Sequence, residues 1–89
     1  MRGVITVIGK DKVGIIAKIC AFLADEGINV LDISQTIVQG FFNMLMIVDM
    51  GDTGDRFGEI DLSLKNLGEL VGVDIKLQSE EIFDAMHRV

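Results

Sequence analysis

The sequence predicts an α+β sandwich in which a four-stranded antiparallel sheet carries two helices on one face. Runs with the two-residue period of a strand and stretches with the 3.6-residue period of a helix alternate in the order β-α-β-β-α-β. The two predicted strands that are apolar on both faces, residues 2–9 and 41–50, are also the two that this topology places in the centre. Two right-handed crossovers joined by a hairpin give the strand order 4-1-3-2.

Residues 2–9 form the first predicted strand, and a helix follows after the loop Lys10–Val13. Asp11 is the predicted N-cap, because a short side-chain carboxylate accepts hydrogen bonds from free N–H groups of a first turn. The helix runs to about Glu26, and Gly27 ends it. Its apolar stripe has the spacing i, i+3, i+4, i+7 and consists of Ile16, Ile19, Cys20 and Leu23.

A hairpin is predicted for residues 29–39 and 41–50, because Gln39-Gly40 provides a tight turn between them. In the first of these strands the apolar residues alternate with polar ones and are Leu31, Ile33 and Ile37. In the second strand, one face carries Phe42, Met44, Met46, Val48 and Met50, and the other carries Phe41, Leu45 and Ile47. The methionine stripe is expected to be core, since methionine fills irregular gaps.

The second half of the chain repeats the helix–strand pattern. A helix is predicted over residues 55–68, with Gly68 at its end and an apolar face of Phe57, Ile60, Leu64 and Leu67. In residues 72–78 apolar and polar residues alternate strictly, which predicts an edge strand. Its solvent-exposed face carries Asp74, Lys76 and Gln78. Residues 80–88 predict a short terminal helix. We therefore assign residues 1–79 to one domain and residues 80–89 to its helical extension.

Composition limits the classes of function. The 89-residue chain is 49% hydrophobic with a mean hydropathy of +0.46, so we expect a modest core and surplus apolar surface that a second copy covers. The net charge of −6 argues against binding to nucleic acid or to an anionic membrane surface. No apolar run approaches the roughly 18 residues of a membrane span. One cysteine and the lack of a leader pattern predict a cytoplasmic protein.

The loop from Gly9 to Gly14 is the predicted centre of function. Free backbone N–H groups and the positive end of a helix dipole favour a carboxylate there. We expect this corner and Asn29 to converge on one small ligand. Each of these residues has two possible roles. Gly14 either lets the backbone approach a ligand or allows the helix to pack on the sheet, and Asp11 either binds a ligand amine or caps the helix. Asn29 either contacts the ligand or is a turn residue after Gly27.

The residues resemble the ACT domain family, whose fold is ferredoxin-like. The resemblance covers about residues 3–79 and depends on the element order, the loop Gly9-Lys10-Asp11-Lys12-Val13-Gly14-Ile15, and Gly27-Ile28-Asn29-Val30. Asp32 to Thr36 and the tail from Ser79 to Met86 are similar to stand-alone ACT proteins of the UPF0237 group. The resemblance implies binding of an amino acid or related metabolite, usually between two ACT domains. The positions that it implies as ligand contacts are Asp11, Val13, Gly14, Ile15, Asn29 and, less directly, Asp32.

Catalytic and metal chemistry are not expected. The one histidine, His87, is near the C-terminus, so no catalytic triad can be assembled, and no metal-ligand cluster or phosphate loop is present. The acidic turn from Asp49 to Asp55 lacks the distant glutamate of an EF-hand. We therefore expect a regulatory homodimer without metal or cofactor, acting on a protein target. The alternatives are a ligand-free interaction module and an acylphosphatase-like hydrolase, whose first loop would offer only Lys10 and Lys12 to a phosphate.

Overall fold

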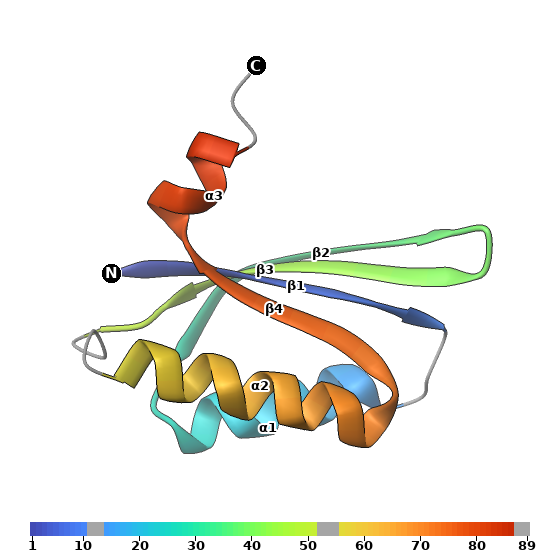
Figure 1. The fold of residues 1–89 in the computed structure, drawn as a ribbon, viewed down its shortest axis with the longest axis horizontal. Helices are drawn as coiled ribbons and strands as arrows, with labels where there is room; N and C mark the ends of the chain where they lie inside the picture. Colours follow the sequence, from blue (N-terminus) through green and yellow to red (C-terminus); the bar gives the residue numbers. More distant parts are fainter. Residues whose placement is uncertain (11–13, 52–55, 87–89) are drawn as a thin grey trace.

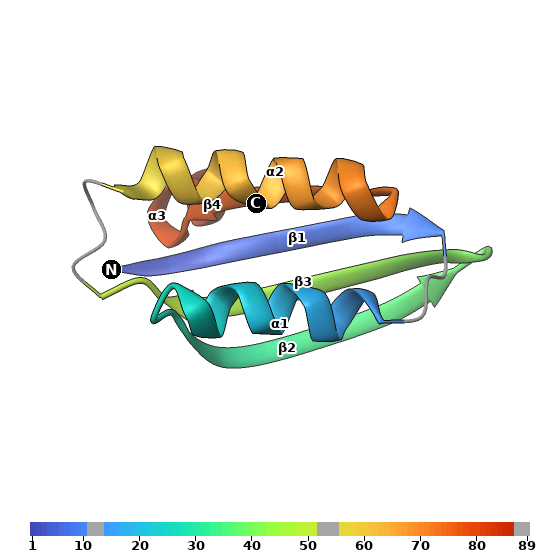
Figure 2. The ribbon, with the colours of Figure 1, turned by 90° about the horizontal axis from the view of Figure 1, so that it is seen from below.

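Four strands form one antiparallel sheet, and two helices cover one of its faces (Figures 1 and 2). The computed structural model describes residues 1–10, 14–51 and 56–86. The elements in chain order are β1 (Arg2–Lys10), α1 (Ile15–Asp25), β2 (Asn29–Val38), β3 (Phe41–Asp49), α2 (Phe57–Val71), β4 (Val73–Ser79) and α3 (Glu80–Met86). The sheet order is β2-β3-β1-β4, which is the predicted order 4-1-3-2 counted from the other edge. The predicted ferredoxin-like fold is therefore confirmed.

The core lies between the sheet and the layer formed by α1 and α2. The core consists mainly of alternate residues of the central strands β1 and β3 and of the apolar residues on the sheet-facing side of each of these two helices. The side chains with no measurable exposure are Ile5 and Val7 of β1, Ile19 and Leu23 of α1, Met46 and Val48 of β3, and Leu64 of α2. Met44 and Met50 are also buried, so the predicted methionine stripe is confirmed as core.

The two ends of α1 differ in how well the sequence predicted them. At the C-terminal end Gly27 has φ 72°, the Ile28 N–H donates to the Leu23 carbonyl at 2.9 Å, and the Gly27 N–H donates to Ala24 at 3.1 Å, as in a Schellman motif. The predicted stop at Gly27 is therefore confirmed. At the other end the N-cap is Gly14, so the N-cap predicted at Asp11 is wrong. Asp11 itself lies outside the described residues.

The predicted end of α2 at Gly68 is also wrong. The helix continues to Val71, and Gly72 ends it with φ 83°. Gly68 is buried, and a Cβ atom at this position would lie 2.7 Å from the Val73 carbonyl oxygen and 3.2 Å from Cγ1 of Ile75. Its glycine is therefore required for the close approach of α2 to β4, and not for helix termination.

This contact gives a test of the fold with a control in the same helix. We expect Gly68→Ala to destabilise the protein by about 1–3 kcal/mol, because the added methyl forces α2 away from the backbone of β4. Gly58→Ala adds the same methyl where no described atom outside its own stretch of the helix lies within 4 Å, so it should leave stability unchanged or raise it by up to about 1 kcal/mol. Urea unfolding of both variants measures the difference. Equal effects would contradict the close packing at Gly68.

The β2–β3 hairpin has a tight turn and an exposed outer strand. Gln39 and Gly40 have φ of 51° and 83°, as the predicted two-residue turn requires. A register shift between Val30 and Asp32 leaves Leu31 as the extra residue of a bulge. The sequence did not predict this bulge. Apart from half-buried Val30, every residue of β2 is exposed, so β2 is a long, uncovered sheet edge.

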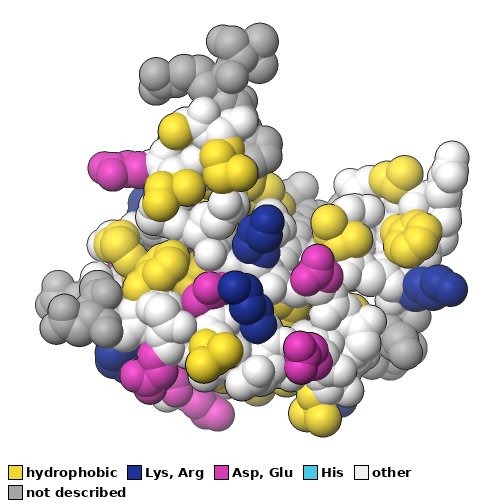
Figure 3. Space-filling model, viewed as in Figure 1, with side chains coloured by type: hydrophobic (Ala, Val, Ile, Leu, Met, Phe, Trp, Pro, Cys, Tyr) yellow, Lys and Arg dark blue, Asp and Glu magenta, His cyan; other side chains and the backbone are white. Residues whose placement is uncertain are grey.

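The short helix α3 lies on the face of the sheet opposite α1 and α2 (Figure 1). The Ser79 hydroxyl accepts a hydrogen bond from the Ile82 N–H at 3.2 Å and begins the helix, and Arg2 pairs with Glu80 at 3.3 Å. The helix is described as far as Met86, so the rest of the predicted span 80–88 lies outside the described residues. Figure 3 shows hydrophobic side chains gathered over α3 and over the tip of the β2–β3 hairpin.

Candidate ligand-binding site

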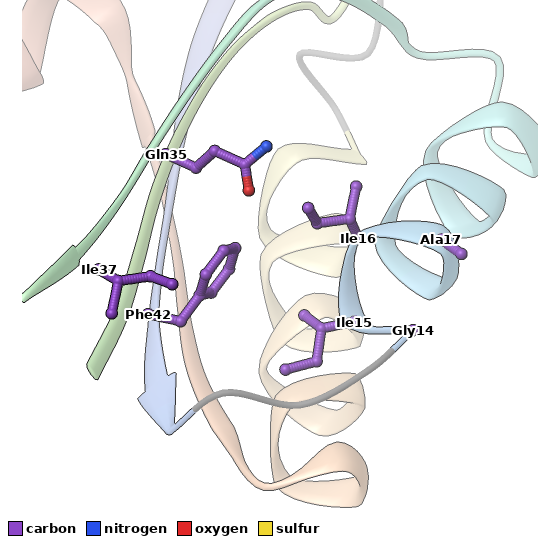
Figure 4. A pocket seen from close by; sticks show the side chains of 7 residues that line it. All are labelled: Gly14, Ile15, Ile16, Ala17, Gln35, Ile37 and Phe42. Atoms are coloured by element: carbon purple, nitrogen blue, oxygen red, sulfur yellow. The ribbon is translucent and has the colours of Figure 1, made fainter. Parts of the chain in front are cut away.

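A pocket opens between the N-terminal end of α1 and the hairpin. Its volume is about 550 Å³, and Figure 4 shows side chains from the sheet and from the helix pointing toward each other across it. The described lining residues are Gly14, Ile15, Ile16 and Ala17 at the start of α1, Gln35 and Ile37 of β2, and Phe42 of β3. The hairpin extends beyond the helical layer, so this end of its inner face is left without a helix above it (Figure 1).

Gly14 sets the geometry of the first turn of α1. Its φ of 87° lies in the left-handed region that favours glycine, and its carbonyl accepts the first helical hydrogen bond, from Lys18 N–H at 3.0 Å. Among the described residues that are not its chain neighbours, no atom would lie within 4 Å of a Cβ atom on Gly14, so these residues give no packing reason for this glycine. Among the described side chains none caps this helix end. The first turn of α1, with the positive end of the helix dipole, therefore borders the pocket through Gly14 and Ile15.

The structure brings only part of the predicted site together. Gly14 and Ile15 line the pocket, and Asp11 and Val13 lie outside the described residues. Asn29 pairs with Asp49 at one end of β3, whereas the pocket lies at the other end, beside Phe42. The expected convergence of the Gly14 corner and Asn29 within one chain is therefore wrong. The physical reason is that α1 runs the length of the sheet and separates the segments at its two ends.

Asp32 is also remote from the pocket. It pairs with Ile47 and lies on the sheet face opposite the helices, because Ile47 and buried Met46 alternate along β3. Sequence reasoning missed Gln35, Ile37 and Phe42 as site residues. A signal for Gln35 was present: it is a polar residue at a strand position whose neighbours on the same face, Ile33 and Ile37, are apolar.

The described residues offer recognition groups and no cluster for metal binding. Nowhere in residues 1–10, 14–51 and 56–86 do three His, Cys, Asp or Glu side chains gather where they could hold a metal ion. The side-chain oxygen of Asp49 accepts a hydrogen bond from the Gly51 N–H at 2.9 Å, which gives that carboxylate a local role in the turn. Within the same ranges no helix is long and apolar enough to cross a membrane.

Comparison with known proteins identifies the family. Residues 3–78 match the sequence model of the ACT domain family. The chain belongs to the ACT domain family. A UPF0237 protein of Bifidobacterium longum is 51% identical over 88 residues, covering 99% of this chain and 98% of the relative. A UPF0237 protein of Clostridium acetobutylicum is 49% identical over the full length of both chains. The resemblance expected from the sequence is therefore confirmed.

Solved structures agree with this assignment. An ACT domain protein from Streptococcus pneumoniae superposes with a TM-score of 0.84 at 38% identity and covers 98% of each chain. The regulatory subunit of aspartate kinase from Thermus thermophilus superposes with a TM-score of 0.67 at 28% identity, over 89% of this chain and 51% of the subunit. ACT domains are regulatory modules that bind small ligands. The pocket beside Gly14 lies at the N-terminal end of α1, where no described side chain caps the helix.

Proposed function

We propose that this ACT domain is a non-catalytic, cytoplasmic regulatory protein that binds an amino acid or a related carboxylate metabolite. The observation that carries the proposal is the pocket of about 550 Å³ at the first turn of α1, where no described side chain caps the helix. A ligand carboxylate at this position accepts hydrogen bonds from backbone N–H groups and meets the positive end of the helix dipole. In this proposal Asp11 and Val13 contribute from the loop, and Gly14 and Ile15 from the helix start.

A homodimer would complete the site with the residues that one chain holds apart. The exposed edge of β2 carries Leu31 at 47% and Ile33 at 39% exposure, and such edges favour pairing with another strand. A twofold axis near the middle of β2 pairs the two copies antiparallel. The partner subunit's Asn29 then lies beside Val38, at the end of β2 that borders the pocket. The partner subunit's Asp32 stays on the sheet face opposite the helices. Of these two residues, Asn29 is therefore the one that can contribute across the dimer interface.

Ligand binding in such an interface couples to assembly. A ligand that contacts both copies binds the dimer more tightly than the monomer, so it shifts the population toward the dimer. The dimer then presents a different surface to a protein target. The other candidate function is a ligand-free interaction module, which is favoured by the exposed apolar residues Ile82 and Met86 on α3.

A thermal-unfolding panel of amino acids separates the two candidates. A ligand at 100 times its dissociation constant should stabilise the protein by about 2.7 kcal/mol, and this stabilisation should disappear in Gly14→Val. The reason is that a branched residue with φ near 87° costs about 1–2 kcal/mol and displaces the first turn. Gly14→Asn is the matched control, because asparagine tolerates this conformation. A flat response of the unmodified protein to every amino acid would favour the interaction module.

A further inference from the structure

We infer that the pocket selects an α-amino acid with an apolar side chain and that Gln35 recognises its ammonium group. This inference rests on the proposed function and deepens it. Of the described side chains that line the pocket, Gln35 is the one with a polar group, and the others are aliphatic or aromatic. Figure 4 shows the Gln35 amide directed from β2 into the space between Phe42 and Ile16, with its oxygen toward the pocket.

The amide of Gln35 is available to a ligand. Within the described part of the chain, the Gln35 side chain makes no hydrogen bond. The other described lining residues are apolar and offer its amide no side-chain partner. An amide oxygen in this position accepts a hydrogen bond from an ammonium group, and a bond to a charged donor is stronger than one between neutral groups. Gln35 thereby takes the amine-binding role that one interpretation of the sequence gave to Asp11.

The remaining lining defines the ligand side chain. Phe42 is only 8% exposed and presents its ring to the pocket, while Ile37 is 65% exposed and forms the open wall. A carboxylate at the start of α1 and an ammonium group at Gln35 direct the ligand side chain toward these two residues. The part of a charged or strongly polar side chain that contacts Phe42 would lose its water without a partner among the described lining side chains. Leucine, isoleucine and phenylalanine therefore fit this lining, and lysine and aspartate do not.

Calorimetric titration with two related ligands tests the assignment of Gln35. L-leucine carries the carboxylate, the ammonium group and the side chain, whereas 4-methylpentanoate lacks only the ammonium group. We expect Gln35→Met to weaken L-leucine by about 10- to 100-fold, the range of one hydrogen bond to a charged group, and to leave 4-methylpentanoate within about twofold. Thr36→Val, which changes the adjacent residue on the opposite sheet face, is the matched control and should leave both affinities unchanged.

The same titrations separate failure of this inference from failure of the proposed function. Equal weakening of L-leucine and 4-methylpentanoate by Gln35→Met would overturn the recognition of the ammonium group. Tighter binding of L-lysine or L-aspartate than of L-leucine, with sensitivity to Gly14→Val retained, would overturn the apolar selectivity while the proposed function stands. Absence of binding for every amino acid would overturn the proposed function itself, and this inference with it.

Discussion

Leu64→Ala should destabilise the protein by about 2–5 kcal/mol, the largest effect that we expect from a single side-chain truncation. Leu64 has no measurable exposure and lies on the face of α2 that packs on the sheet, so its removal leaves a cavity in the core. Cores of small domains contain few side chains, and a loss of this size is a large part of a total of about 5–15 kcal/mol. The measurement is urea unfolding at a fixed protein concentration, since a dimer unfolds in a concentration-dependent way.

Leu70→Ala provides the control for this prediction. Leu70 belongs to the same helix and loses the same atoms, but it is 82% exposed. The change in the free energy of unfolding should stay within about 0.5 kcal/mol, because little surface is removed from contact. Similar losses for both variants would mean that α2 presents a different face to the sheet. A loss confined to Leu70→Ala would mean that this leucine lies in an assembly interface.

The fold was predictable because its signals are local. Strand and helix periods, the turn at Gln39-Gly40 and the stop at Gly27 are properties of a few adjacent residues, and the structure confirms them. The end of α2 was not predictable in this way, because Gly68 and Gly72 are both plausible stops. The distance from Gly68 to the backbone of β4 decides between them, and this distance exists only after the helix has packed on the sheet.

The site was less predictable, because it depends on which segments meet. Gly14 and Asn29 flank the same helix, and an α1 of 11 residues separates its two ends by about 16 Å. The prediction that the Gly14 loop and Asn29 converge on one ligand did not account for the length of α1. Gln35 reaches the pocket through the register of β2 on β3, where it pairs with Met44. The bulge at Leu31 changes the phase of β2, so alternation alone could not place the residues before the bulge on the same faces as those after it.

Ile33→Lys should convert the proposed dimer into a monomer and weaken L-leucine binding by at least about 100-fold. Ile33 is 39% exposed on the edge strand β2, where a lysine disfavours pairing between strands. One unpaired charge buried in an interface costs about 3–5 kcal/mol, which exceeds the roughly 2.7 kcal/mol of a 100-fold change in affinity. A twofold contact places this charge in the interface twice. Sedimentation velocity at micromolar concentration measures the assembly, and calorimetric titration measures the affinity.

Leu70→Lys is the matched variant for this experiment, because it places the same charge on α2, away from the β2 edge. It should leave both the dimer and the affinity unchanged.

The two readouts together identify which residues the site needs. A monomeric Ile33→Lys that still binds L-leucine with unchanged affinity would show that one chain forms the complete site through Gly14 and Gln35. A monomeric Ile33→Lys that has lost binding would instead support a contribution from the partner subunit's Asn29. A dimeric Ile33→Lys would contradict pairing through β2 and direct the search for the interface to the face that carries α3.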